Sequence, residues 1–347
     1  MIRMDQDKID SLRRKNVLLL VSDLKLTTYD ISIIMGVYKE RKFQEGGRYE
    51  ILWIPIVEQE REDLPSQFKS LQSQMPWYTV HRPSLINKVA TKVIKEKWHF
   101  RQETILVVLG PQGKVECHNA IHVSRMLGIQ AFPFSDSVVS TIWRRRDINW
   151  FEMLVNDSVI PKIPEIIKSE KLIFLYASED NKHVQELEEH LKKVRDDSGD
   201  AVVAFNLTKI SLFWTRLESC MFSMVQAQID VLDSLMQDVL KLYTSFKKEG
   251  GFVLVTKGSR VVINSPMTSA SKVISQYDAW KKQVDVAGGK TLEMALKEHH
   301  DKVVAPEACY HFYVPNMVGC MPENVKCPVC PRIMRNVVKF ECCHGAH

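Results

Sequence analysis

Most of the cysteines of this chain lie close together near its end. Six of the eight fall after residue 305, and some of these have a spacing that could do chemistry. Cys327 and Cys330 form a C-x2-C pair, and Cys342, Cys343 and His344 follow it. Thiolate and imidazole groups at such spacing are typical ligands of tetrahedral zinc. The sequence therefore predicts a structural zinc site made of Cys327, Cys330, Cys342 and either Cys343 or His344.

Two other interpretations of these thiols stay open: they form cross-linking disulfides, or they have no special role. The charged start of the chain, Met1–Lys8, has no apolar segment of a signal peptide, which favours a reducing, cytoplasmic location where disulfides are rare. No catalytic acid or base accompanies the thiols, so a bound zinc would be structural. The stretch 332–341, with Val337, Val338 and Phe340, predicts a strand that returns the second pair to the first.

A second kind of thiol chemistry, that of thioredoxin, is not supported by the sequence. It needs a C-x-x-C pair directly after the first strand, where the N-terminus of a helix lowers the pKa of one thiol. Here the apolar run Val17–Val21 is followed by Ser22–Thr27, which contains no cysteine. The proline that this fold usually places before its third strand is also missing from Arg101–Thr104. We therefore expect this part of the chain to be redox-inert.

Other short motifs carry less information. Gly288–Thr291 is similar to the end of a P-loop, but Val284 stands where the motif requires glycine. The stretch Cys117–His122 could place one thiol and two imidazoles on one helix face, without an acid, base or nucleophile to accompany them. His299–Asp301 is typical of a solvated helix end. We predict no catalytic residues and no cofactor-binding residues, and expect neither an enzyme nor a small-molecule substrate.

Composition and charge exclude several classes of protein. The chain has 347 residues, 45% of them hydrophobic and 26% charged, which is typical of a globular protein. Its net charge of +5 is small and well mixed, which argues against a nucleic-acid partner. No apolar run approaches the ~18 residues that a membrane span needs.

The first part of the chain alternates strand and helix patterns, which must position whatever chemistry it has. Expected strands are residues 17–21, 49–57, 104–109 and 114–116, and expected helices follow Thr27 and cover residues 64–71, 84–98 and 119–127. This order, β-α-β-α-(α)-β-β-α, is that of a thioredoxin-like fold, a mixed sheet with helices on both faces.

A second copy of the same α/β order begins at residue 171, although no residue-level repeat is visible. Expected elements are the strand 171–177, the helix 184–194, the strand 201–205, the long helix 210–246, the hairpin 251–263 and the helix 271–282. Unbroken, the long helix would reach ~55 Å at 1.5 Å per residue. Its stripe of methionine and aromatic residues is most simply core, with a partner-helix surface as the alternative.

The predicted fold class is therefore α/β, in three parts. A degenerate thioredoxin-like domain without a redox site covers residues 1–135. A second α/β domain with a long helix covers residues 136–304. Residues 305–347 form a Cys-rich tail, the place of the predicted zinc knuckle.

Several stretches, in order along the chain, resemble one protein family. They are Lys15–Leu24, Tyr49–Val57, Met75–Val80, Ile94–Phe100, Leu106–Val115, Ala131–Phe134, Phe213–Ser219 and the cysteines Cys327, Cys330, Cys342 and Cys343 with Met334. From about residue 15 to residue 343 the chain resembles the sieve element occlusion proteins, the filament-forming P-proteins of plant phloem. It corresponds to the C-terminal half to two-thirds of a typical member. The Met-Pro-Trp and Pro-Gln-Gly-Lys-Val pieces are also similar to tryparedoxin and nucleoredoxin.

The resemblance implies a structural protein of phloem filaments in the cytoplasm of sieve elements. It implies roles in phloem development and in sealing sieve plates after wounding, with self-association or association with longer relatives. Two departures limit this: Pro331 replaces the usual glycine after the second cysteine, and no calcium-binding loop is present. The alternative function is a thiol-disulfide redox protein that uses the C-terminal cysteines.

Overall fold

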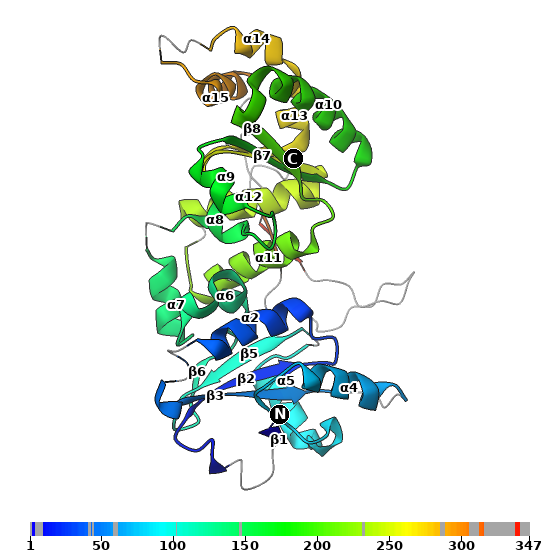
Figure 1. The fold of residues 1–347 in the computed structure, drawn as a ribbon, viewed down its shortest axis with the longest axis vertical. Helices are drawn as coiled ribbons and strands as arrows, with labels where there is room; N and C mark the ends of the chain where they lie inside the picture. Colours follow the sequence, from blue (N-terminus) through cyan, green and yellow to red (C-terminus); the bar gives the residue numbers. More distant parts are fainter. Residues whose placement is uncertain are drawn as a thin grey trace. The chain divides into compact units, whose positions relative to one another are not determined.

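The computed structural model of the chain describes most of its residues (Figure 1). These are residues 2–3, 10–40, 43, 45–57, 62–101, 103–145, 148–230, 233–284, 289–304, 312–315 and 337–340. They pack into two compact units. The first contains residues up to Ile148 together with Phe222–Ile229, and the second contains Asn149–Met221 and described residues from Asp230 onward.

The first unit is built on a six-stranded mixed sheet. The strands, in spatial order, are β1 (Ile2–Arg3), β4 (Tyr78–Thr79), β3 (Tyr49–Pro55), β2 (Asn16–Ser22), β5 (Ile105–Leu109) and β6 (Val115–Cys117). The first four run parallel, β5 is antiparallel to β2, and β6 returns antiparallel to β5. The central strand β2 is buried from Val17 to Ser22, which explains why its sequence is apolar at consecutive positions rather than alternating.

Three of the five helices described in the first unit begin at a residue whose side chain caps them. The five helices are α2 (Thr28–Lys39), α4 (Leu64–Ser73), α5 (Lys88–Lys97), α6 (Ile121–Leu127) and α7 (Asp136–Trp143), with 3-10 turns η1 (Glu45–Gly47), η2 (Pro83–Leu85) and η3 (Gly128–Ala131). Thr27, Asn87 and Ser135 each accept a hydrogen bond from a backbone N–H of the following helix, which is α2, α5 and α7 in turn. Ile94 of α5 packs against a cluster that includes Val17, Leu19 and Val21 of β2.

The second unit is built on a four-stranded mixed sheet. Its strands, in spatial order, are β8 (Val202–Asn206), β7 (Leu172–Ser178), β9 (Gly251–Lys257) and β10 (Arg260–Pro266). β7 and β8 are parallel, and the hairpin of β9 and β10 is antiparallel to β7 through β9. Gly251 is required where the two central strands meet, because a Cβ there would lie 2.6 Å from the carbonyl oxygen of Ala177.

The second unit has helices both before and after the hairpin of β9 and β10. They are α8 (Trp150–Leu154), α9 (Ile163–Lys168), α10 (Asn181–Ser198), α11 (Ser211–Gln226), α12 (Ser234–Glu249), α13 (Met267–Ser275), α14 (Tyr277–Lys281) and α15 (Leu292–Val303), with the 3-10 turn η4 (Gly199–Ala201). The last residues of α11 belong to the first unit. One core cluster joins β7 and β9 to α10, α13 and α15, and includes Phe174, Leu187, Val273 and Leu296.

The two sheets share one topology. In each, two parallel strands lie beside an antiparallel strand that continues into a hairpin: β3-β2-β5-β6 in the first unit and β8-β7-β9-β10 in the second. The helix after the central strand contacts the helix after the hairpin in both units, as α2 with α6 and α10 with α13. The predicted mixed α/β class is confirmed, and the second copy of the strand order is present without a residue-level repeat.

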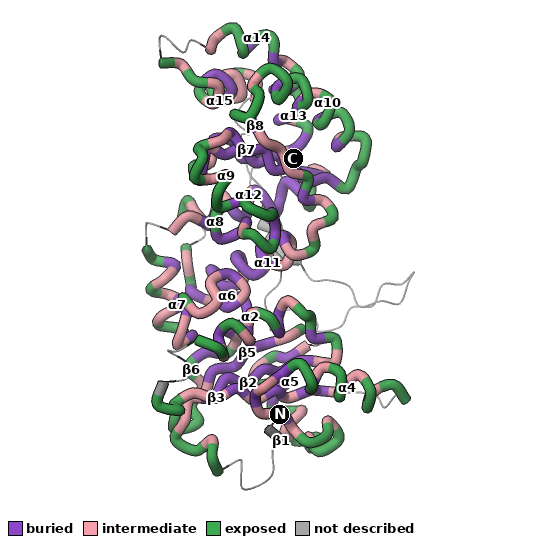
Figure 2. The backbone as a smooth tube through the Cα atoms, viewed as in Figure 1, coloured by how far each residue is buried: buried purple, intermediate pink, exposed green. Residues whose placement is uncertain are grey.

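The predicted long helix 210–246 is wrong, because the segment forms two helices. α11 ends in a closed turn in which the N–H groups of Gln228 and Ile229 donate to the carbonyls of Val225 and Met224. Gln228 has a left-handed φ of 55°, and Asp233 then caps the start of α12. The interpretation of the apolar stripe as core is confirmed, since most of its described members are buried (Figure 2), among them Phe213, Leu217, Met221, Met236, Leu240 and Tyr243.

The helix expected at 271–282 is also divided, into α13 and α14. The strand expected within 332–341 is confirmed as β12 (Val337–Phe340), which pairs antiparallel with β11 (Phe312–Pro315). α7 packs with the first unit. Because a packing unit is not the same as an independently folding domain, the domain bounds 1–135, 136–304 and 305–347 stay a prediction.

Candidate functional site

The position of a thioredoxin-type redox pair, directly after β2, holds side chains that stabilise the fold. Ser22 ends the strand fully buried, and its Oγ accepts a hydrogen bond of 2.9 Å from the indole Nε1 of Trp53 on β3. Leu26 is buried in the connecting loop, and Thr27 caps α2. No thiol stands at this helix start, so the chemistry of a disulfide exchange is absent from it.

A buried ion pair joins the same helix to α6. The carboxylate of Asp30, 1% exposed, accepts two hydrogen bonds from the guanidinium of Arg125, at 2.7 Å from Nε and 2.9 Å from Nη2. The hydroxyl of Tyr29 donates to the backbone carbonyl of Arg125 at 3.0 Å. This fork-to-fork geometry is specific and strong, and it joins α2 to α6. Sequence reasoning missed this pair; the available signal was an aspartate next to Ile31 and Ile34 on the apolar side of the helix.

The two described thiols are unreactive. Cys117 at the end of β6 and Cys220 in α11 are both fully buried and free. Burial and, after it, the nearby Asp136 carboxylate raise the pKa of Cys117, and burial raises the pKa of Cys220 to about 12. A thiol must ionise to act as a nucleophile. Neither thiol therefore does so near neutral pH.

The stretch Cys117–His122 does not share one helix face, because Cys117 ends a strand and His122 lies in α6. His118 is exposed, whereas His122 is buried with its ring centroid 4.8 Å from that of Phe222. Burial, together with the nearby charge of Arg125, lowers the pKa of His122 to about 3. This imidazole is neutral at physiological pH and belongs to the packing of the first unit.

In the two weaker sequence motifs, Gly288–Thr291 and His299–Asp301, the side chains of Lys290 and His300 make hydrogen bonds within the fold. The side chain of Lys290, the lysine of the P-loop imitation, donates to Gln283 at 3.2 Å and to Glu298 at 2.7 Å, so it is not held for a phosphate. His300 lies in the last turn of α15, but its side chain is only 12% exposed and bonds Ser265 at 3.2 Å. The expectation of a solvated helix end is therefore wrong for His300.

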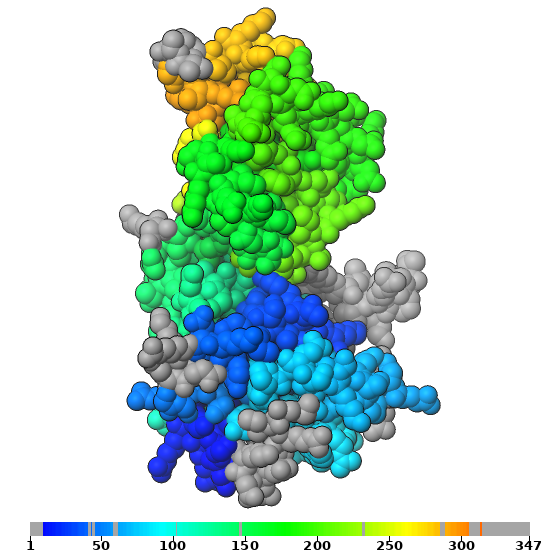
Figure 3. All heavy atoms as spheres, viewed as in Figure 1, coloured from blue at the N-terminus to red at the C-terminus, as the bar shows by residue number. Residues whose placement is uncertain are grey.

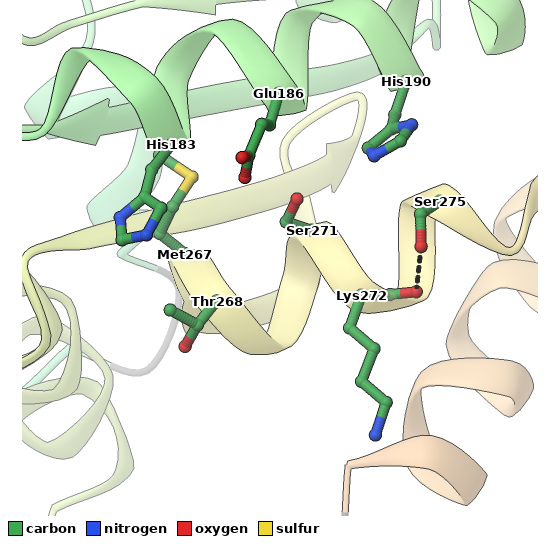
Figure 4. Close-up of a pocket in the computed structure, with 8 residues that line it drawn as sticks. All are labelled: His183, Glu186, His190, Met267, Thr268, Ser271, Lys272 and Ser275. Atoms are coloured by element: carbon green, nitrogen blue, oxygen red, sulfur yellow. Dashed lines mark hydrogen bonds between the residues drawn. The ribbon is translucent and has the colours of Figure 1, made fainter.

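A shallow cavity of about 220 Å³ lies between α10 and α13 (Figure 4). It is lined by His183, Glu186, His190, Met267, Thr268, Ser271, Lys272 and Ser275. The two histidines and Glu186 come from successive turns of α10 and point toward α13. Among the residues that the structure describes, no three His, Cys, Asp or Glu side chains are placed to hold a metal ion. Within that same set neither histidine bonds Ser271, so the cavity has no activated hydroxyl.

The predicted zinc ligands Cys327, Cys330, Cys342, Cys343 and His344 lie outside the described residues. The prediction of a zinc site, and its alternatives, therefore stay predictions. For the part of the chain that the structure describes, no helix is both long and apolar enough to cross a membrane.

Comparison with known proteins identifies relatives of the whole chain. Residues 199–344 match the sieve element occlusion C-terminus family. Protein SIEVE ELEMENT OCCLUSION B of Arabidopsis thaliana is 31% identical over 97% of this chain and 51% of its own length. Protein SIEVE ELEMENT OCCLUSION A of the same plant is 24% identical over 96% of this chain and 45% of its own. The chain thus spans about half the length of the curated relatives it matches.

Among solved structures, tryparedoxin II from C. fasciculata aligns with 37% of this chain and 81% of its own, at 17% identity and a TM-score of 0.30. The relatives named above cover nearly all of this chain, and the C-terminal family match runs from η4 to the Cys-rich tail. These matches place residues 199–344 in the sieve element occlusion C-terminus family and support the sieve element occlusion family for the whole chain.

Proposed function

We propose that this protein is a structural, non-enzymatic component of phloem filaments, of the sieve element occlusion type. The observation that carries the proposal is the match to SIEVE ELEMENT OCCLUSION B along 97% of this chain at 31% identity. The proposal includes the roles that the family resemblance implied, in phloem development and in sealing sieve plates after wounding. It also includes a place in the cytoplasm of sieve elements.

Each compact unit, in this proposal, is a degenerate thioredoxin-like domain used as a scaffold. The shared strand order β3-β2-β5-β6 and β8-β7-β9-β10 supports this interpretation. The residues that follow the two central strands support the absence of a redox site in each unit. Asp23 and Thr27 follow β2, and Glu179 and Asp180 follow β7, where a redox protein would have its thiols.

Assembly would involve further copies of this chain or longer relatives. The support for assembly is the family, and not the apolar stripe of α11 and α12, since that stripe is buried within the chain. Electron microscopy and light scattering of the purified chain, alone and mixed with a full-length relative, test the proposal. Filaments or large particles are expected in at least one of these samples. A chain that stays monomeric at high concentration in both would contradict it.

A structural zinc in the tail completes the proposed architecture. Its ligands would be Cys327, Cys330, Cys342 and either Cys343 or His344, because a C-x2-C pair and a second close pair are a sufficient tetrahedral set. Binding free energy of a structural zinc, on the order of 10 kcal/mol in zinc-finger peptides, would order a segment that is too short to build a core of its own. Elemental analysis of protein purified without added metal should find about one zinc per chain. Protein that contains no zinc and whose six tail thiols are freely titratable would contradict it.

A further inference from the structure

The face formed by η2 and α5 combines exposed apolar side chains with a concentration of positive charge. Three of the five large apolar side chains that are exposed among the described residues lie here: Leu85 at 58%, Val89 at 71% and Val93 at 44%. Val89 and Val93 are one helical turn apart and therefore lie on one side of α5. Figure 2 shows most of α5 as exposed, and its residues belong to the cyan part of the surface in Figure 3.

The exposed strip is not needed to hold α5 in place. The helix is fixed to the sheet by Ile94, which is 5% exposed and packs in the cluster with Val107 and Phe100. Asn87 caps the first turn and accepts a 2.7 Å hydrogen bond from the N–H of Ala90. Leu85, Val89 and Val93 contribute little to this packing, so the fold alone does not explain why they are apolar.

Positive charge surrounds the strip. Residues 82–101 contain six lysines and arginines and one acidic residue, Glu96, a net charge of +5 that equals the net charge of the whole chain. Lys88, Lys92, Lys95 and Lys97 of α5 are all exposed. Glu96 lies 3.7 Å from Lys92, and both side chains are more than half exposed, so this pair neutralises little. Within the described residues, Arg82, Lys88 and Lys97 have no ion pair.

We propose that the face formed by η2 and α5 binds the anionic surface of a lipid bilayer, with α5 lying in the plane of the headgroups. Lysine side chains would reach the phosphates and carboxylates, while Leu85, Val89 and Val93 would enter the boundary between headgroups and acyl chains. A helix that carries lysines around an apolar strip is typical of membrane-surface segments. Long lysine stems can also lie along an apolar boundary while their charges stay in water.

A bilayer fits this face better than a second copy of the chain does. The cations of α5 are lysines, which act as point charges and do not require the planar, two-oxygen geometry that arginine recognises. Diffuse negative charge spread over a surface therefore matches them.

Co-sedimentation of the full chain with lipid vesicles tests the proposal. The chain should bind vesicles that contain phosphatidylserine and should not bind vesicles of phosphatidylcholine alone. Binding should weaken from about 0.1 M to about 1 M salt, because the screening length falls from about 10 Å to about 3 Å. Each lysine near an anionic surface strengthens binding about fivefold, so Lys88→Gln with Lys97→Gln should weaken it about 25-fold.

Lys168→Gln with Lys192→Gln is the matched control, because it removes the same charge from exposed positions on α9 and α10. It should leave vesicle binding unchanged. Val89→Thr with Val93→Thr keeps side-chain shape and should weaken binding while preserving its salt dependence. Equal binding to neutral vesicles, or an equal loss in the control pair, would overturn the proposal. So would a Lys88/Lys97 variant that binds vesicles normally and loses self-association, which would assign the face to a protein contact.

Discussion

At the start of α2, where a thioredoxin has its redox thiols, this chain has an ion pair between Asp30 and Arg125 that stabilises the fold. A redox thiol at a helix N-terminus would need access to solvent and a lowered pKa. Here the first turn carries a carboxylate that is 1% exposed and held by two hydrogen bonds from one guanidinium. Ser22 and Trp53 are likewise joined by a buried hydrogen bond. The residues at this place serve the packing of strand and helix.

Asp30→Asn should destabilise the first unit by about 3 kcal/mol, because it leaves the largely buried guanidinium of Arg125, 16% exposed, without its counter-charge. Urea unfolding followed by circular dichroism measures the change. Asp200→Asn, at an exposed position in η4, is the control and should change the free energy of unfolding by less than about 0.5 kcal/mol. Replacing both partners, as Asp30→Leu with Arg125→Met, should cost less than Asp30→Asn alone. A double variant less stable than the single one would contradict this account.

His122 should make the first unit sensitive to acid. Its folded-state pKa is lowered to about 3, whereas an unfolded histidine has a pKa of about 6.5. The unfolded chain therefore binds more protons between these two values, and stability falls as pH falls below about 6.5. At pH 5 the loss is about 2 kcal/mol. His122→Gln should flatten the dependence of unfolding free energy on pH between 7 and 5, while His118→Gln, at an exposed site, should leave it unchanged. An unchanged slope in His122→Gln would contradict the assignment.

At the scale of elements, periodicity predicted the strands well but failed where helices end. The strands β2, β3, β5, β7, β8 and β9 lie within two or three residues of the expected runs, and α2 begins directly after Thr27 as predicted. Apolar spacing continues through Met224, Ile229 and Leu232. It therefore gives no signal for the left-handed turn at Gln228. The pair of Asp30 and Arg125 could not be predicted either, because it depends on two helices 95 residues apart meeting on one face of the sheet.

Gln228→Gly should stabilise the protein, by up to about 1 kcal/mol, because glycine adopts a left-handed φ without the steric cost that glutamine has. Gln237→Gly, at an exposed position inside α12, should destabilise it by about 1 kcal/mol. The two substitutions are chemically identical and are expected to have opposite signs in thermal unfolding. A loss of stability in Gln228→Gly would show that the turn after α11 does not require this conformation.

At the scale of the whole molecule, one strand topology occurs twice and carries no thiol at the equivalent place in either copy. In the second unit, Ser178 ends the central strand and its Oγ donates to the carbonyl of Gly250 at 2.6 Å. Asp180 then caps α10 by accepting from the N–H of Lys182 at 2.8 Å. Buried serines therefore close both central strands, and hydroxyl or carboxylate caps begin both following helices. Neither of these two helix starts therefore carries a thiol.

The purified chain should therefore be inactive in dithiol-dependent reduction of insulin. Cys117 and Cys220, the described thiols, are fully buried, and burial raises the pKa of both. A chain truncated before residue 305 provides the decisive comparison, provided that its circular dichroism shows a folded protein. Activity in the full chain that disappears on truncation would favour the redox alternative at the tail cysteines. Activity that survives truncation would mean that Cys117 or Cys220, the two cysteines before residue 305, is reactive despite its burial.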